Sequence, residues 1–338
     1  MLAGGRRGAA ERHQTLRAAI DWSFDLLTGA EQALLGRLTV FAGGCTLEAA
    51  EAVCGGDHID AGAVFGLLAS LVARSLVVAE ENGPQTRYRL LETIRQYGEE
   101  RLDGVGETER WRARHAGYYA DFLRQVRDHG RDPGDGAFWA VRLGAERDNL
   151  LAAWSWVTGT GDVDTAFSIL AGFAPCEIWT SYPLLLPGNA ALELPGATEH
   201  PGYPLALAVC AMFASNRADV TGAEELCRQA AEASARRGTP DWRVAVTVCA
   251  TRSNIASATG AFTDAARLAE QAAGIARAGG DLADASVELT IAAIDHRLAG
   301  DAPAAVPLAS QALAGPPGRS PGPHRDQPAR RGHDGRRG

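Results

Sequence analysis

The chain has 338 residues, enough for two or three modules with separate cores, and a formal net charge of −8. An acidic balance of this kind argues against a general binder of nucleic acid or of membrane surfaces. All 33 basic residues are arginine, and a chain without lysine can form neither a phosphate-binding P-loop nor a lysine Schiff base. We therefore expect no ATP hydrolysis by this chain.

Six cysteines are spread along the chain without a CxxC pair, and most lie in apolar helical stretches. This usage is typical of small buried hydrophobic residues in a reducing compartment. We find no signal peptide, and no apolar run approaches the roughly 18 residues that a membrane span requires. The sequence predicts a cytoplasmic protein without membrane contact.

The first segment predicts four helices. Apolar residues at helical spacing from Leu16 to Leu27 predict the first, and the second runs over 30–41. Thr46 is the expected N-cap of the third, and the fourth spans about 61–74.

A β-hairpin follows these helices. Residues 75–80 and 86–90 are rich in strand formers, and Asn82-Gly83 is the expected turn between them. Helices followed by a small hairpin are the arrangement of a winged helix. The helix that would read DNA, over 61–76, has Arg74 as its one basic side chain and is apolar nearly all round. We therefore expect it to be buried against its neighbours, and we expect no direct DNA contact through it.

From Leu91 onward the pattern is helical. Apolar and aromatic side chains recur at helical spacing, which predicts a buried aromatic face: Trp111, His115, Tyr118, Tyr119 and Phe122. A segment rich in proline and glycine then breaks the pattern and marks a junction.

The C-terminal third contains an internal repeat. The pattern is a small residue, then Ala, Leu, Gln and Ala at fixed spacing, and it begins at Ala218, Gly260 and Gly300. We expect the small residues to let two helices approach closely and each helical pair to stack on the next. The offsets of 42 and 40 residues leave open tetratricopeptide-like repeats, which we favour, and repeats of the HEAT type. A partial match at Gly161 suggests that the array begins before the junction.

Leu226, Leu268 and Leu308 occupy equivalent positions, and we expect them to be buried. The last repeat is followed by residues 315–338, where Ala329 is the one aliphatic residue. Such a segment cannot bury enough apolar surface to order itself. We interpret it as a premature or out-of-frame ending, with a basic nucleic-acid-binding arm as the alternative.

Two motifs carry a family resemblance: RHQTLRAAIDWSFDLLTGAEQALLGRLTVFAGG at 12–44 and RYRLLETIRQYGEERL at 87–102. They resemble the signal-transduction ATPases of the STAND class, in particular the large bacterial LuxR-type regulators. In that class a nucleotide-binding switch precedes a winged helix and tetratricopeptide-like repeats. The resemblance covers residues 12 to 315. It implies a winged helix and tetratricopeptide-like repeats without the nucleotide-binding switch.

The expected fold is predominantly α: a winged helix with a small β-hairpin, followed by a tetratricopeptide-like helical solenoid. We divide the chain into a remnant of a preceding domain (1–13), a winged-helix domain (14–104), a helical connector (105–175), a Pro-rich junction (176–204), tetratricopeptide-like repeats (205–314) and a disordered tail (315–338).

The resemblance also implies a nucleotide-sensing position. In the STAND class a Met-His-Asp-like motif follows the hairpin, and its His contacts bound diphosphate. The matching positions here are Leu91 and Glu92, so the acidic residue is present and the His is replaced by Leu. The alternative is that Leu91 is a core residue and that Glu92 favours the positive end of a helix.

No catalytic constellation stands out, so we do not classify the chain as an enzyme. Asp57, His58 and Asp60 superficially offer metal ligands, but a polar loop is the favoured interpretation because no second cluster lies at a diagnostic spacing.

The resemblance implies the regulatory part of an ATP-switched regulator of transcription or signalling. The winged helix would relay the nucleotide state of the upstream domain. The repeats would bind an effector or a protein partner, and ATP or ADP would belong to the full-length protein. The alternatives are a stand-alone winged-helix transcription factor with a repeat-type sensor and a plain scaffold.

Overall fold

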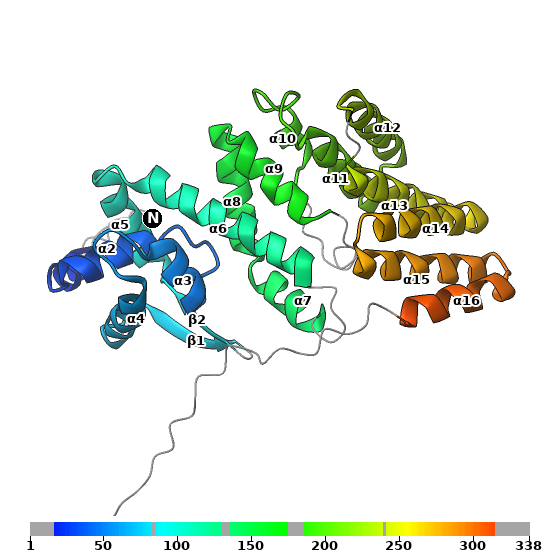
Figure 1. Ribbon diagram of the computed structural model, residues 1–338. Coiled ribbons are helices and arrows are strands. Elements are labelled where there is room, and N and C mark those ends of the chain that lie inside the picture. Colours follow the sequence, from blue (N-terminus) through cyan, green and yellow to red (C-terminus); the bar gives the residue numbers. More distant parts are fainter. Residues whose placement is uncertain (1–16, 83–84, 130–135, 175–185, 239–240, 315–338) are drawn as a thin grey trace, which may run out of the picture.

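The computed structural model describes residues 17–82, 85–129, 136–174, 186–238 and 241–314. The chain runs from a small N-terminal module with a β-hairpin, along a long helix, into helical pairs stacked side by side (Figure 1). The predicted fold class is confirmed: a predominantly α chain with a winged helix, one small hairpin and a helical repeat region. The predicted tail at 315–338 and remnant at 1–13 lie outside the described residues.

The N-terminal module contains the predicted helices. A helix over residues 17–25 precedes α2 (Gly29–Leu38), α3 (Leu47–Cys54), the 3-10 turn η1 (Ala61–Ala63), α4 (Val64–Ala73) and α5 (Glu92–Gly104). Side chains fix where two of them start. Thr28 and Glu31 form a capping box at α2, and the Thr46 hydroxyl accepts the Ala49 N–H at the start of α3.

The hairpin joins β1 (Val78–Asn82) to β2 (Gln85–Arg89) in antiparallel register, with Val78 opposite Arg89. An isolated bridge between Cys45 and Tyr88 adds the segment between α2 and α3 to this small sheet. Gly83 of the predicted turn lies outside the described residues. The order of helix, bridge, two helices and hairpin is that of a winged helix.

Four helices follow: α6 (Thr108–His129), α7 (Gly136–Ala145), α8 (Arg147–Thr160) and α9 (Val163–Gly172). The predicted aromatic face of α6 is buried except at Tyr118, which is only half-buried. The other four residues are at most 3% exposed: Trp111, His115, Tyr119 and Phe122. Gly172 lets α9 approach α6, because a Cβ there would lie 2.5 Å from the Leu123 Cβ.

The repeats are three antiparallel pairs that follow the short α10 (Asn189–Leu192). They comprise α11 (Tyr203–Asn216) with α12 (Val220–Arg236), α13 (Trp242–Ala258) with α14 (Phe262–Ala278), and α15 (Leu282–Leu298) with α16 (Ala302–Leu313). In Figure 1 these helices lie side by side at the C-terminal end of the molecule.

The small residue that opens each repeat has a different role from the one we expected. Ala218, Gly260 and Gly300 take positive φ angles of 61°, 82° and 85° at the turn between the two helices of a pair. They therefore reverse the chain in the left-handed conformation, and close helix approach does not explain them. Gly161, between α8 and α9, has the same conformation at φ 78°. The same kind of turn is therefore present before the predicted Pro-rich junction.

The expectation of buried leucines in the repeats is wrong. Leu226, Leu268 and Leu308 are each only partly buried. The inner stripe of α14 consists of alanines at most 1% exposed: Ala265, Ala266, Ala269, Ala272, Ala273 and Ala276. Small side chains allow the helix axes to come close, and the leucines lie beside that contact.

Five of the six cysteines lie in the described part of the chain, and all five are buried with free thiols. Burial raises the pKa of the Cys54 and Cys210 thiols to about 12. They act as small hydrophobic residues, as predicted.

Candidate functional site: a buried polar junction

A buried ion pair joins the winged helix to the helical connector. Arg87, on β2, donates to Glu146 at the start of α8, with Nη1–Oε1 at 2.7 Å and Nη2–Oε2 at 3.1 Å. The two side chains are only 9% and 8% exposed. A guanidinium and a carboxylate that meet through two parallel bonds form a strong and directional contact.

Backbone carbonyls of the winged helix complete the coordination of Arg87. Its Nε donates to the Gly43 carbonyl at 2.8 Å and its Nη2 to the Gly44 carbonyl at 3.0 Å. Asn149, one turn along α8 from Glu146, donates its Nδ2 to the Gly44 carbonyl and to Glu146, at 2.8 Å each. The loop after α2 is therefore held by side chains from both modules.

Two residues of α6 enclose the cluster. The Tyr119 hydroxyl donates to Glu146 Oε2 at 2.6 Å, and His115 Nε2 lies 3.4 Å from Asn149 Oδ1. The His115 ring also packs edge-on against Phe41, with 5.2 Å between ring centroids. Side chains from β2, α6 and α8 thus share one buried network.

The network sets the charge states of its members. Burial alone would raise the pKa of Glu146, but the Arg87 guanidinium and the Tyr119 and Asn149 hydrogen bonds outweigh it, so this pKa is lowered. Burial lowers the pKa of His115 to about 4. At neutral pH the cluster holds a charged Arg87–Glu146 pair beside a neutral imidazole.

A second contact between the modules surrounds Trp111 on α6. The Arg37 guanidinium, from α2, lies 4.0 Å from the centre of the Trp111 ring, and its Nη1 donates to the Cys54 carbonyl at 2.7 Å. Arg114 donates from α6 to the Gly55 and Ala52 carbonyls at the end of α3. Two separate sets of contacts therefore fix α6 against the winged helix.

An open cleft of about 440 Å³ lies beside the buried network. Its lining includes Arg95, Glu99, Arg112, His115 and Trp156, so it adjoins the cluster at His115. Arg95 is already paired with Glu92 at 2.8 Å and with Glu99.

The surface that would face DNA is apolar and acidic. Val64, Leu68 and Leu71 turn α4 inward, whereas Phe65 on the opposite side is 56% exposed. Gly66, Ala69 and Ala73 are exposed on that side too, so the expectation that this helix is buried all round is wrong.

The two exposed arginines of this surface have carboxylate partners. Arg74 lies 3.9 Å from Glu31, and Arg89 lies 3.3 Å from Glu80 on the hairpin. Phosphate contacts are made largely by basic side chains such as Arg and Lys. Both exposed arginines at the end of α4 and on the hairpin are thus paired with carboxylates.

Leu91 and Glu92 lie on the surface where the hairpin leads into α5. Leu91 is 54% exposed at the N-cap, so its alternative assignment as a core residue is wrong. Glu92 lies in the first helical turn and accepts hydrogen bonds from Arg95 and Gln96, which lower its pKa to about 2. The structure does not bring these two residues into the buried network.

The acidic loop at 57–60 is engaged in structural contacts. Asp57 pairs with Arg110 at 2.8 Å, and the Asp60 side chain accepts the Gly62 N–H as the N-cap of η1. His58 is exposed. The polar-loop interpretation accounts for the two carboxylates.

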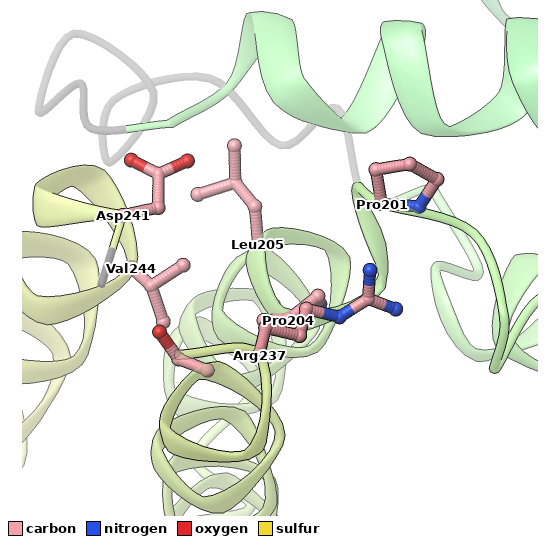
Figure 2. A pocket seen from close by; sticks show the side chains of 7 residues that line it. Pro201, Pro204, Leu205, Arg237, Asp241 and Val244 are labelled. Carbon is pink, nitrogen blue, oxygen red and sulfur yellow. The ribbon is translucent and has the colours of Figure 1, made fainter. Parts of the chain in front are cut away.

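A further hollow of about 410 Å³ lies among the repeats, between α11, α12 and α13. Figure 2 shows Arg237 and Asp241 on its rim with Pro201, Pro204 and Leu205. Both charged groups have partners: Arg237 donates to the His200 carbonyl at 2.7 Å, and Asp241 pairs with Arg243 at 3.0 Å. Arg237 thus holds the segment before α11, and Asp241 caps the start of α13.

Our sequence-based prediction missed the network itself. A signal for it is present where α7 leads into α8, because Glu146 and Asn149 interrupt an apolar spacing made by Leu143 on α7 and by Leu150 and Ala153 on α8. Polar residues on the buried stripe of a helix require partners. The sequence does not reveal that the partner is Arg87, 59 residues away.

Comparison with known proteins supports the winged helix. Residues 27–103 match the family described as the winged helix-turn-helix domain. The N-terminal module is a winged helix by family as well as by fold. Within the described residues, no helix is both long and apolar enough to cross a membrane.

Mycobacterial proteins are among those similar to this chain. The Mycobacterium tuberculosis H37Rv protein named "Putative HTH-type transcriptional regulator Rv0890c" is 42% identical over 184 residues, which cover 53% of this chain and 20% of that protein. The M. tuberculosis protein named "Uncharacterized protein Rv0894" is 43% identical over 116 residues, 34% of this chain and 30% of that protein. The matched part is thus about a fifth of the length of the regulator.

Among solved structures, a STAND protein with a tetratricopeptide repeat sensor from Pyrococcus horikoshii aligns with 86% of this chain and 45% of its own. The TM-score is 0.40 at 16% identity. The winged-helix family and the similarity to HTH-type regulators support a regulatory role for this chain.

Proposed function

We propose that this chain is the regulatory part of a larger, ATP-switched, LuxR-type transcriptional regulator of the STAND class. The winged helix passes the nucleotide state of an upstream domain to the helical repeats, and the repeats bind an effector or a protein partner. ATP or ADP belongs to the upstream domain, with Leu91 and Glu92 nearest to it, and the protein acts in the cytoplasm.

The buried Arg87–Glu146 network is the observation that carries this proposal. A relay requires that a displacement on one side be felt on the other. Arg87 holds the loop after α2 through two carbonyls and α8 through a carboxylate. Tight, well-packed contacts of this kind transmit small shifts because they do not deform continuously.

The surface of α4 supports a protein contact on the other side of the winged helix. Phe65 and the exposed small residues beside it form an apolar face, and the hairpin next to it carries Glu80 and Glu81. A face depleted of charge suits a protein interface better than a phosphate backbone.

Hydrogen exchange on the whole chain tests the relay. Glu146→Gln keeps the shape of the side chain and removes its charge, so we expect faster exchange in α2 and in the hairpin as well as in α8. The matched control is Glu224→Gln, which removes an exposed pair with Arg252 and is expected to leave the winged helix unchanged. Loss of protection confined to α8 would show that the network does not couple the modules.

The second candidate is a stand-alone winged-helix transcription factor with a repeat-type sensor. The match of residues 27–103 to the winged helix-turn-helix domain and the names of the relatives favour it. Titration of a labelled duplex with the whole chain at several salt concentrations separates the two candidates. We expect binding no stronger than that of an acidic control protein, whereas nanomolar affinity with a steep salt dependence would establish the alternative.

A further inference from the structure

The open cleft beside the buried network has walls from both sides of the junction. Its lining includes Thr39, Val40 and Arg95 from the winged helix and Arg112 and Trp156 from α6 and α8. We call it the junction cleft. None of its lining residues adjoins a gap in the described ranges. Its volume of about 440 Å³ is that of a site for a small molecule.

The two arginines of the junction cleft differ in their partners. Arg95 uses its donors on Glu92 and Glu99. Arg112 is exposed, and no carboxylate of the described residues pairs with it. A planar guanidinium with free donors can bind a carboxylate through two parallel hydrogen bonds. Because Glu99 offsets the charge of Arg95, the lining keeps one net positive charge, which suits a carboxylate better than a doubly charged phosphate.

A second polar group of the junction cleft is buried. His115 is 2% exposed and yet forms part of the lining. The Asn149 amide is oriented by its own bonds, since its Nδ2 donates to the Gly44 carbonyl and to Glu146. Its Oδ1 is therefore an acceptor, and His115 Nε2, at 3.4 Å, carries the ring proton. The Nδ1 of the neutral ring is then an acceptor to which no described residue donates, so its donor must come from the cleft.

The remaining lining is largely apolar. The half-buried Trp156 lies one turn from Ala152 on α8, and Val40 contributes from the loop after α2. An indole surface packs well against a flat aromatic ring. The donor that reaches His115 must be uncharged, because an ammonium group would be repelled by Arg112. A hydroxyl group on an aromatic ring meets this condition.

We propose that the junction cleft binds a small aromatic carboxylate that carries a hydroxyl group. Arg112 binds the carboxylate, Trp156 packs against the ring, and His115 accepts the hydrogen bond of the hydroxyl. A ligand in this position touches the winged helix and the connector at once, so its binding holds the two modules together. The site is separate from the effector-binding role proposed for the repeats, and its test does not depend on that role.

Titration of the whole chain with the three hydroxybenzoate isomers, followed by the NMR signals of the ligand, tests the proposal. We expect at least one isomer to bind with a Kd below about 1 mM. Benzoate, which lacks the hydroxyl, should bind about 3- to 10-fold more weakly than that isomer. Failure of all three isomers to bind at about 10 mM would overturn the proposal, and equal affinities for benzoate and the hydroxybenzoate would contradict the role of His115.

A charge-removing variant locates the ligand. Arg112→Gln changes an exposed side chain, so we expect an unchanged fold and an affinity about 10- to 100-fold lower. The matched control is Arg236→Gln, at an exposed arginine on the last turn of α12, which should leave the affinity unchanged. An affinity that Arg112→Gln does not lower would show that the ligand binds elsewhere, and would overturn the assignment of the junction cleft.

Discussion

Two regions of this molecule are packed through different kinds of side chain. At the junction of the winged helix with α6 and α8, large polar side chains are buried and bound to one another, as in the Arg87–Glu146 pair. Between α14 and its neighbours, the α14 side of the contact is made of alanines, which allow the helices to pack closely, and the polar side chains buried there belong to α13 and α15. The junction is therefore sensitive to charge, whereas the alanine stripe of α14 is sensitive to side-chain volume.

Removal of one partner of the buried ion pair has the largest expected effect. Glu146→Ala leaves the Arg87 guanidinium buried without its carboxylate, and we expect a loss of about 3–5 kcal/mol in the free energy of unfolding. Chemical denaturation measures it. Glu80→Ala, which removes an exposed pair with Arg89, should change stability by less than about 1 kcal/mol. Equal losses for the two variants would contradict the special role of the junction.

Packing around α14 should respond to side-chain volume instead of charge. Ala269, which is fully buried on α14, has no room for a larger side chain, so Ala269→Leu should destabilise the chain by about 1–3 kcal/mol. Leu268→Ala, at the partly buried neighbour, should have a smaller effect because its side chain lies beside the contact. Thermal unfolding of both variants tests the order, and a larger loss for Leu268→Ala would mean that the leucines form the core.

Acid should weaken the junction through His115. Burial lowers the pKa of this imidazole to about 4, against about 6.5 for an unfolded chain. As the pH falls between these values, the unfolded state binds the proton first, so stability falls, by about 2 kcal/mol at pH 5. Unfolding as a function of pH should show a shallower slope for His115→Gln in this range. Identical slopes would mean that His115 is not buried in its neutral form.

Substitutions at the repeat turns should change stability the least, and one of them should increase it. Ala218 has a left-handed φ of 61°, where Gly260 and Gly300 occupy the equivalent turns. Ala218→Gly should stabilise the chain by about 0.5–1 kcal/mol, and Gly260→Ala should destabilise it by a similar amount. A loss of stability on Ala218→Gly would contradict the left-handed assignment.

Local signals in the sequence predicted most of the elements. Capping by Thr46, the aromatic face of α6 and the hairpin each depend on residues a few positions apart, and all are present in the structure. The positions of the small repeat residues were predicted, but their reason was not, because spacing alone does not distinguish a left-handed turn from a close helix contact.

The candidate site could not be predicted in the same way. Arg87 and Glu146 are far apart in sequence, and each is polar in a segment whose burial depends on how the modules pack. The exposed face of α4 was missed for the same reason, since an apolar helix is equally compatible with a core and with an interface. Leu91 and Glu92 were selected by family resemblance alone, and their role remains a prediction.

A double-mutant cycle between Arg87 and Glu146 tests the central claim most directly. The free energy of unfolding is measured for the wild type, Arg87→Leu, Glu146→Leu and the double variant. If the buried pair couples the winged helix to the connector, each single variant loses several kcal/mol while the double loses less than their sum, with a coupling of about 2 kcal/mol or more. Losses that add to within about 0.5 kcal/mol would show that the two residues act independently and would contradict the coupling.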